Sequence, residues 1–318
     1  MTTTLTHPFG TLPTKDLLSI SQLAAGDLGT IFEAAAALKA DRNAYADLLR
    51  GKRLGMIFEK ESLRTRFTFD VGMQDLGGSA VFMDHRHVRL GTRESIKDMA
   101  KNLERWVHGI VARTYKHKAL EELAANCSIP VINGLSDFVH PCQALADFFT
   151  LTERWGDVRG RKITYVGDGN NTCHSLLHVA TRLGAHITVS CPEGYEPNAR
   201  VVHEAMLVAR ETGSDVRIQN DPEAGARDAD AIYTDVWASM GQEDETEERA
   251  AIFNDFRVDE EMMALAKPDA VFMHCLPAHR GQEVTSGVID SKASIVFDIA
   301  ENRLHVQKAV LALLLGKD

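Results

Sequence analysis

The feature that most constrains this chain is an alternation of short apolar, β-branched segments with longer segments of helical period. Parallel sheets with helices on both faces produce this pattern, because each strand is followed by a crossover helix. The expected strands cover residues 53–59, 80–84, 110–114 and 130–133 in the first half of the chain, and 162–168, 186–191, 216–220, 231–236, 270–275 and 295–299 in the second. We therefore predict an α/β fold of two domains, each a parallel β-sheet flanked by helices.

Helical segments fix the expected domain boundaries. The length of 318 residues is about twice that of a typical domain. Helices are expected at 28–38, 64–76, 95–106 and 118–126, and two more, 140–156 and 301–315, are expected to link the domains. This predicts a first domain over residues 1–142, completed by the C-terminal helix at about 301–318, and a second domain over 143–300.

Charge and composition exclude several classes of protein. The 35 basic and 45 acidic residues give a net charge of −10, which makes nucleic acid an unfavourable partner. Apolar residues make up 44% of the chain, but no run approaches the ~20 that a membrane span needs. The five cysteines form no CxxC pair, and the first residues resemble neither a secretory nor a transit peptide, so we expect a cytoplasmic protein with reduced thiols.

The residues that follow each expected strand carry the chemistry, since ligands of open α/β sheets bind beyond the carboxyl ends of the strands. Ser62, Leu63, Arg64, Thr65 and Arg66 follow the first strand and open the next helix. Free N–H groups, the helix dipole, hydroxyls and guanidiniums together predict a phosphate site. The alternative is an N-cap serine followed by two solvated arginines.

Two further motifs are less specific. His140 and Gln143 lie on one face of a helix that begins at Pro141, where they either bind a small polar group or cap the helix. The glycines at 167 and 169 hint at a dinucleotide turn, but position 172 is Thr and no acidic residue ends the next strand. A nicotinamide-dependent dehydrogenase is therefore disfavoured. The acidic stretch 243–248 is either a solvated helix start or a lid.

A carboxylate and a thiol converge at the ends of two later strands. Asp235 ends one strand, and His274 and Cys275 end another. Adjacent residues on a strand point to opposite faces, and no CxxC or HxxxH spacing includes His274 or Cys275. We therefore predict no structural metal at this site.

Taken together, these motifs resemble those of the transcarbamylases, specifically the ornithine carbamoyltransferase branch. Order and spacing match from about residue 10 to the end. The matching segments are Phe58–Arg66, His140–Gln143, Gly167–Asn171, Asp235–Gly241, His274–Pro277 and Glu301–Arg303. Aspartate enzymes usually have Thr where Cys142 stands and lack His-Cys-Leu-Pro, so this chain resembles the ornithine branch.

The resemblance implies transfer of the carbamoyl group of carbamoyl phosphate to the δ-amine of L-ornithine, giving L-citrulline and phosphate without a cofactor. It implies catalytic roles for Cys275, Arg113, His140 and Asp235, with Cys275 or the phosphate itself accepting the proton. The implied carbamoyl phosphate contacts are Ser62, Leu63, Arg64, Thr65, Arg89, Arg113, His140, Gln143, Cys275, Leu276 and Arg303. The implied ornithine contacts are Asn171, Asp235, Ser239 and Met240.

Two positions depart from the family pattern. Leu63 stands where ornithine enzymes usually have Thr, and Leu there is typical of N-acylornithine carbamoyltransferases, which are the alternative. Asp235 and the run from Ser239 suit a free α-ammonium group, which favours ornithine. Arg89 stands where many relatives have Gln on a contact from a neighbouring subunit. The resemblance further implies a homotrimer or a multiple of trimers, and a cis Leu276–Pro277 bond. A non-catalytic homologue would lack some of Arg64, Arg113, His140 and Cys275, and all are present.

Overall fold

The structure, a computed structural model, describes residues 8–84, 89–238 and 245–316. The chain forms two units, the first made of Met1–Leu145 with Glu301–Asp318 and the second of Ala146–Ala300. Two helices, α5 (Pro141–Trp155) and α12 (Val296–Leu315), have residues in both units. Each unit contains a parallel sheet flanked by helices, so the predicted fold class is confirmed.

The first unit contains a four-stranded parallel sheet in the order β2-β1-β3-β4. Its strands are β1 (Arg53–Phe58), β2 (Ser79–Met83), β3 (Gly109–Arg113) and β4 (Val131–Leu135). The helices of this unit are η1 (Ile20–Gln22), α1 (Ala25–Ala40), α2 (Leu63–Asp75), α3 (Ile96–Trp106) and α4 (His117–Asn126).

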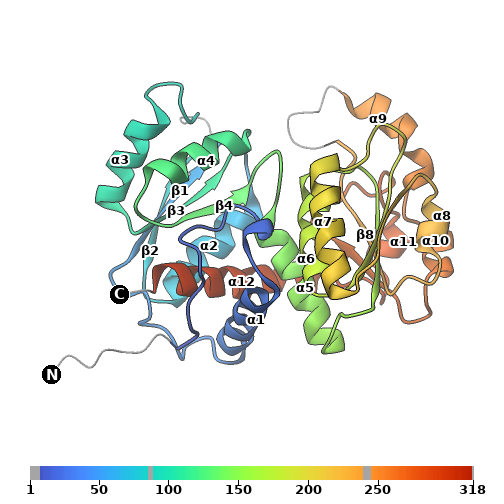
Figure 1. The fold of residues 1–318 in the computed structure, drawn as a ribbon, viewed down its shortest axis with the longest axis horizontal. Helices are drawn as coiled ribbons and strands as arrows, with labels where there is room; N and C mark the ends of the chain where they lie inside the picture. The colour runs from blue at the N-terminus through green and yellow to red at the C-terminus, as the bar shows by residue number, and fades with distance from the viewer. Residues whose placement is uncertain (1–7, 85–88, 239–244, 317–318) are drawn as a thin grey trace. The chain divides into compact units, whose positions relative to one another are not determined.

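Strand order places the helices of this unit on opposite faces of the sheet. Across the sheet, the connection from β1 to β2 runs toward one edge, and the connections from β2 to β3 and from β3 to β4 run toward the opposite edge. Right-handed crossovers therefore put α2 on one face and α3 with α4 on the other (Figure 1). Ile110, Leu120 and Leu123 belong to the core beneath α3 and α4. On the opposite face α2 packs against α12, where a Cβ at Gly72 would lie 3.2 Å from Cγ of Lys308.

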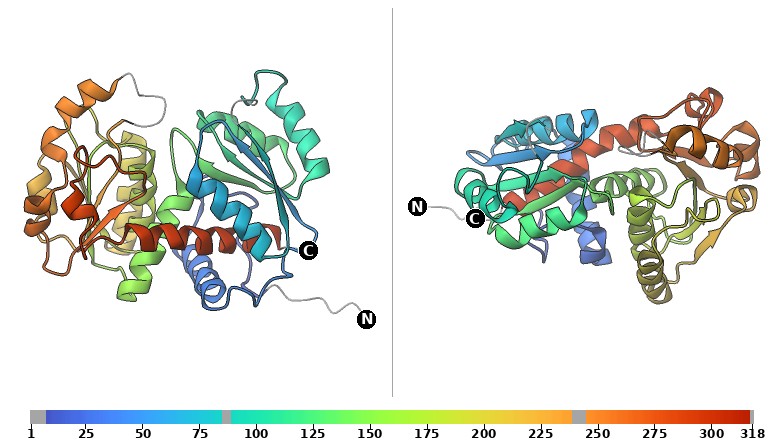
Figure 2. Two further views of the ribbon diagram at one scale, coloured as in Figure 1. Left: turned by 180° about the vertical axis from the view of Figure 1, so that it is seen from behind. Right: turned by 90° about the horizontal axis from the view of Figure 1, so that it is seen from above.

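The second unit contains a five-stranded parallel sheet in the order β7-β6-β5-β8-β9. Its strands are β5 (Lys162–Val166), β6 (His186–Ser190), β7 (Val216–Gln219), β8 (Ala231–Thr234) and β9 (Val271–His274). Its helices are α6 (Asn171–Arg182), α7 (Ala199–Thr212), α8 (Pro222–Ala226), α9 (Thr246–Ile252), η4 (Asn254–Phe256), α10 (Glu260–Leu265) and α11 (Ser286–Ile289). In this unit α6 and α7 cover one face of the sheet, and the short helices from α8 onward cover the other (Figures 1 and 2).

One predicted strand is wrong. Residues 296–299 begin helix α12, Ile295 precedes it, and the neighbouring Ser294 forms an isolated bridge to Phe272. Val296 and Ile299 are buried at helical spacing, and the same spacing continues through Val306 and Val310. No Gly or Pro lies between this β-branched run and the helix that was predicted to begin at residue 301. The run therefore forms the N-terminal part of that helix and not a separate strand.

Each sheet has one point at which the strand order reverses. In the first sheet this point lies between β1 and β3, and in the second between β5 and β8. Ligands of such sheets bind outside the carboxyl ends of the strands at this point. No helix among the described residues is long and apolar enough to cross a membrane.

Candidate active site

At the reversal point of the first sheet, a helix N-terminus meets the end of β1. Ser62 is the N-cap of α2, and its Oγ accepts a hydrogen bond from the N–H of Thr65 at 3.1 Å. No acidic residue lies in the first turn of α2, so the positive end of the helix dipole is not neutralised there. Arg64 is partly buried in this turn, whereas Leu63 is 68% exposed.

Arg303 of α12 is bound within the same unit by three polar side chains. Its guanidinium donates to Oγ1 of Thr65 at 2.9 Å and to Oε1 of Gln143 at 2.5 Å. With its amide oriented to satisfy its neighbours, Gln307 accepts from Nε and Nη2 of Arg303 at 2.9 and 2.8 Å and donates to Thr68. Arg303 is 2% exposed, so this network fixes a buried charge in one orientation.

His140 lies among these cations as a neutral imidazole. It precedes Pro141 at the start of α5, and its side chain is 5% exposed. Burial, followed by the charges of Arg303, Arg113 and Arg64, lowers the pKa of His140 well below its usual value. At neutral pH the imidazole therefore offers one N–H donor without adding a fourth positive charge.

Arg113 ends β3 beside a register shift in its pairing with β4. Its carbonyl accepts from the N–H of Glu59, and its side chain is 7% exposed. Such irregularities redirect side chains next to functional sites. The first unit thus brings together most of the predicted carbamoyl phosphate residues, namely Ser62, Arg64, Thr65, Arg113, His140, Gln143 and Arg303.

Glu59, which lies in the motif Phe58–Arg66 but for which the sequence predicted no role, holds the segment that carries Arg89. Its two carboxylate oxygens accept from the N–H groups of Leu90 and Tyr115, both at 2.8 Å. The guanidinium of the exposed Arg89 lies 5.6 Å above the ring of Tyr115, and Lys60 lies 4.8 Å from the same ring. Arg89 therefore contacts a ring of its own unit, at the outer limit of a cation–π interaction.

At the reversal point of the second sheet, Asp235 accepts hydrogen bonds from three groups. It follows β8 and accepts from Nδ2 of Asn170 at 3.0 Å, from Sγ of Cys275 at 2.9 Å and from the N–H of Val236 at 2.8 Å. Asn170 also caps α6 through the N–H groups of Thr172 and Cys173. The loop that replaces a dinucleotide turn is thereby fixed to the carboxylate, with Asn171 at the first position of the helix.

A buried pair supports the turn that carries Cys275. The N–H of Leu276 donates to Nδ1 of His274 at 2.8 Å, so the proton of the neutral ring sits on Nε2, which lies 3.3 Å from Oε1 of Glu283. His274 and Glu283 are both fully buried, and Glu283 also accepts from the N–H of His279. Leu276 has a φ of +55° and the Leu276–Pro277 bond is cis, as predicted.

Asp235, His274 and Cys275 could hold a metal ion by distance, since their ligand atoms lie within 4.8 Å of one another. Nδ1 of His274 already accepts from Leu276, however, and the thiol donates to Asp235. These internal bonds favour a metal-free site, which stays a prediction.

Arg249 of α9 was also missed. It donates to Oδ2 of Asp168 at 3.1 Å, to the carbonyl of Trp237 at 2.9 Å and to Glu245 at 2.7 Å. Burial raises the pKa of Asp168 to about 6, Arg249 opposes the shift, and Asp235 and Glu245 add to it. The predicted ornithine contacts Ser239 and Met240 lie outside the described residues.

Comparisons with known proteins identify the family of the chain. Residues 15–153 match the family model "Aspartate/ornithine carbamoyltransferase, carbamoyl-P binding domain", and residues 159–314 match the Asp/Orn binding domain of the same family. An ornithine carbamoyltransferase of Pyrococcus abyssi is 53% identical over 95% of this chain and 96% of its own length. The curated relative from Pyrococcus furiosus, named anabolic, is 52% identical over the same shares of the two chains.

Solved structures extend the comparison. The structure of ornithine carbamoyltransferase from Pyrococcus furiosus matches with a TM-score of 0.94 and 51% identity, covering 97% of this chain and 99% of that one. A structure of an N-acetyl-L-ornithine transcarbamylase variant matches at 32% identity with a TM-score of 0.86, covering 95% of this chain and all of that one. With both family models matched across nearly the whole length, the chain belongs to the aspartate/ornithine carbamoyltransferase family.

Proposed function

We propose that this protein transfers the carbamoyl group of carbamoyl phosphate to the δ-amine of L-ornithine, forming L-citrulline and phosphate. The observation that carries the proposal is the buried network of Arg303, Thr65 and Gln143 beside the neutral His140. Such a network matches a ligand with an anionic end and a carbonyl, since it combines fixed cations with neutral donors.

In this proposal the first unit binds carbamoyl phosphate. Ser62, Arg64 and Thr65, with the N-terminus of α2, hold the phosphate and stabilise the charge that develops as it leaves. Arg113 and His140 donate to the carbamoyl oxygen, where negative charge grows in the tetrahedral transition state. Gln143 and the carbonyl of Leu276 accept from the carbamoyl NH₂, while Arg303 is a further donor to the ligand.

The second unit binds the amino acid. Asp235 and Ser239 accept from the α-ammonium group, and Asn171 and the backbone of Met240 bind the α-carboxylate. Ornithine's δ-amine has an ordinary pKa near 10.4, so it must lose a proton before it attacks. Cys275, whose thiol donates to Asp235 at 2.9 Å, orients this amine. As a thiolate it accepts the proton of the amine, and while it remains the thiol the departing phosphate accepts that proton instead.

Free ornithine, not an N-acylated form, is the proposed acceptor. The buried carboxylate of Asp235 fits a cationic amine, which N-acylation removes. A citrulline assay with ornithine, N-acetylornithine and putrescine tests this, and a higher kcat/KM for N-acetylornithine would reverse the assignment.

A homotrimer is the proposed assembly. Leu63 and Phe67 on α2 and Val81 and Met83 on the neighbouring edge strand β2 are 44–68% exposed, and such a patch suits an interface between copies.

We propose that Arg89 reaches the carbamoyl phosphate of the next copy. Mixed trimers of inactive Arg89→Ala and Asp235→Ala chains would then regain about one third of the sites. Hybrids that form but stay inactive would contradict this sharing.

The proposed setting is cytoplasmic arginine synthesis. The five cysteines, all among the described residues, form no disulfide, as expected in a reducing compartment, and the Pyrococcus furiosus relative carries the word anabolic in its name. Measuring kcat/KM in both directions tests the anabolic assignment, which predicts a strong preference for citrulline formation.

A further inference from the structure

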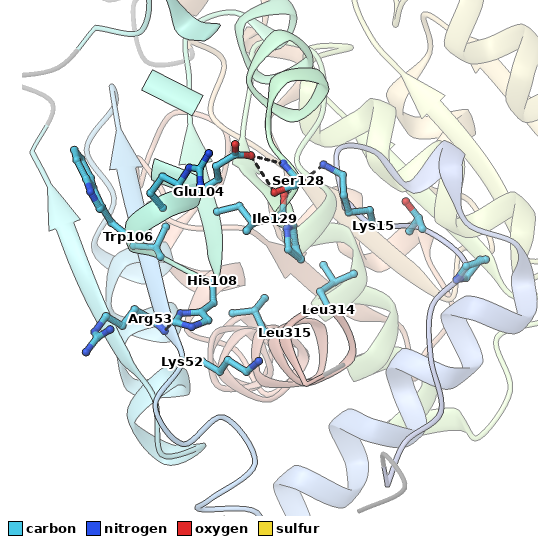
Figure 3. A pocket seen from close by; sticks show the side chains of 15 residues that line it. Lys15, Lys52, Arg53, Glu104, Trp106, His108, Ser128, Ile129, Leu314 and Leu315 are labelled. Carbon is cyan, nitrogen blue, oxygen red and sulfur yellow. Dashed lines mark hydrogen bonds between the residues drawn. The ribbon is translucent and has the colours of Figure 1, made fainter. Parts of the chain in front are cut away.

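A second pocket lies in the first unit, at the amino ends of its strands. It has a volume of about 780 Å³. Lys52 and Arg53 line it at the start of β1, and Trp106 and His108 line it between α3 and β3 (Figure 3). Since β1 runs from Arg53 to Phe58, roughly 20 Å of strand separates this pocket from the phosphate residues beyond the other end.

Cations without a carboxylate partner gather in this pocket, although the protein as a whole has a charge of −10. Lys52, Arg53 and Arg105 line it, and none of the three has an ion pair with residues 8–84, 89–238 or 245–316. Burial and then the charges of Lys52 and Arg53 lower the pKa of His108, which is the response expected in a positive potential.

The other two charged residues of the lining, Lys15 and Glu104, have hydrogen-bond partners within the protein. Lys15 donates to the carbonyls of Ala124, Cys127 and Ile129 and thereby caps the end of α4. Glu104 accepts from the N–H and hydroxyl of Ser128 and from Lys101, which lower its pKa to about 2. The charges of Lys15 and Glu104 are opposite and offset each other, so the lining keeps an excess of three positive charges.

Helix dipoles cancel only part of this positive charge. The C-termini of α3 and α12 reach the pocket at Trp106 and Leu315, and each carries about half a negative elementary charge. Subtracting about one charge from three leaves about two positive charges in the pocket. A dianion would balance them.

The remaining lining is apolar. Val107, Ile129, Leu314 and Leu315 contribute aliphatic surface, and the side chain of Trp106 is 65% exposed (Figure 3). A volume of about 780 Å³ lies within the range of pockets that bind organic ligands, and it exceeds what a bare phosphate fills. We propose that this pocket binds a phosphate monoester that carries an apolar, ring-containing group, at a site separate from the one that binds carbamoyl phosphate.

Phenyl phosphate is the probe that tests the proposal, because it combines a dianion with a ring. Titration of the full-length protein, followed by calorimetry and by tryptophan fluorescence, should show saturable binding that weakens with added salt. Inorganic phosphate, which lacks the ring, and benzyl alcohol, which lacks the charge, should each bind at least about tenfold more weakly at this site. All titrations are repeated in Arg64→Ala protein, so that binding to the carbamoyl phosphate residues is removed.

Matched variants identify the site. Lys52→Gln/Arg53→Gln should weaken binding at least about tenfold. Lys97→Gln/Lys118→Gln removes the same charge from exposed positions outside the lining and should change binding less than about twofold. Trp106→Phe should remove most of the fluorescence change.

Three results would overturn the proposal. The first is absence of binding up to about 10 mM phenyl phosphate, a limit that corresponds to a very weak site. The second is equal binding by Lys52→Gln/Arg53→Gln and wild type. The third is binding that disappears in Arg64→Ala protein, since that would place the anion at the proposed active site.

Discussion

The two sheets present opposite chemistry at equivalent positions. At the reversal point of the first sheet, Arg64, Arg113 and Arg303 surround a neutral His140. At that of the second, Asp235 accepts from a thiol and an amide, and Asp168 lies nearby with a raised pKa. In each region burial, reinforced by like charges, shifts one ionisable group toward its neutral form.

This comparison shows how one architecture serves two ligands. In both sheets the site lies at the carboxyl ends of the strands. The charge of each site depends on which side chains the neighbouring segments bring there. The first region adds Arg303 of the C-terminal helix α12 to the cations at its own strand ends, and the second takes its acceptors and donors from the ends of its own strands. In this carbamoyl transfer reaction, the first region suits the anionic donor and the second the cationic amine.

The largest expected effect is on the cationic region. Arg64→Ala should lower kcat/KM about 10³-fold or more, because a charge-assisted contact to the developing phosphate dianion is lost. Citrulline formation under saturating ornithine measures it. Arg66→Ala is the matched control, since Arg66 lies on the same helix but stacks on Phe82 at 3.9 Å, and it should stay within tenfold of wild type. Similar losses in both would show that helix α2 as a whole had been disturbed.

A smaller effect is expected for the acidic region. Asp235→Asn should raise the KM for ornithine and lower kcat, for a combined loss of about 10²-fold, because the amide cannot accept from Cys275 and Asn170 as a carboxylate does. Binding of carbamoyl phosphate alone, measured by calorimetry, should change little. Equal weakening of both ligands would mean that Asp235 supports the fold instead of the acceptor.

A still smaller effect on kcat is expected for Glu283, which supports the turn that carries Cys275. Glu283→Gln replaces the buried acceptor facing Nε2 of His274 with an amide of the same shape. We expect about a tenfold fall in kcat, with the ornithine KM within a few-fold of wild type, because only the position of Cys275 changes. Glu260→Gln, on exposed α10, is the control and should leave kcat unchanged. An unaltered kcat with a lowered melting temperature would make Glu283 purely structural.

Motif residues were predictable because their positions follow directly from strand ends. The structure contains nine of the ten expected strands. Next to the strand and helix ends that the sequence indicated lie Ser62 to Arg66, His140, Asp235 and Cys275. The supporting roles of Glu59, Gln307, Glu283 and Arg249 were not predicted, although Glu59 lies in the motif Phe58–Arg66, since these roles depend on contacts that only folding reveals. Gln307 offered one signal, because it lies four residues after Arg303 on the same helix.

The smallest predicted effect is on the pH dependence of the unfolding free energy. It tests whether burial of Asp168 outweighs its ion pair with Arg249. The pKa of Asp168 is about 6 in the folded protein and about 3.9 in an unfolded chain, so the folded state binds the proton more tightly. The resulting stabilisation is complete below about pH 4 and is lost as the pH rises through about 6. Relative to Asp168→Asn, which does not titrate, wild type should therefore lose up to about 2 kcal/mol of unfolding free energy between pH 4 and 7.5. Urea denaturation of both proteins across this range measures the difference. Arg249→Met, which removes the opposing cation, should move the loss to higher pH. A difference that grows with pH instead would mean that the ion pair with Arg249 outweighs burial and that the pKa of Asp168 is lowered.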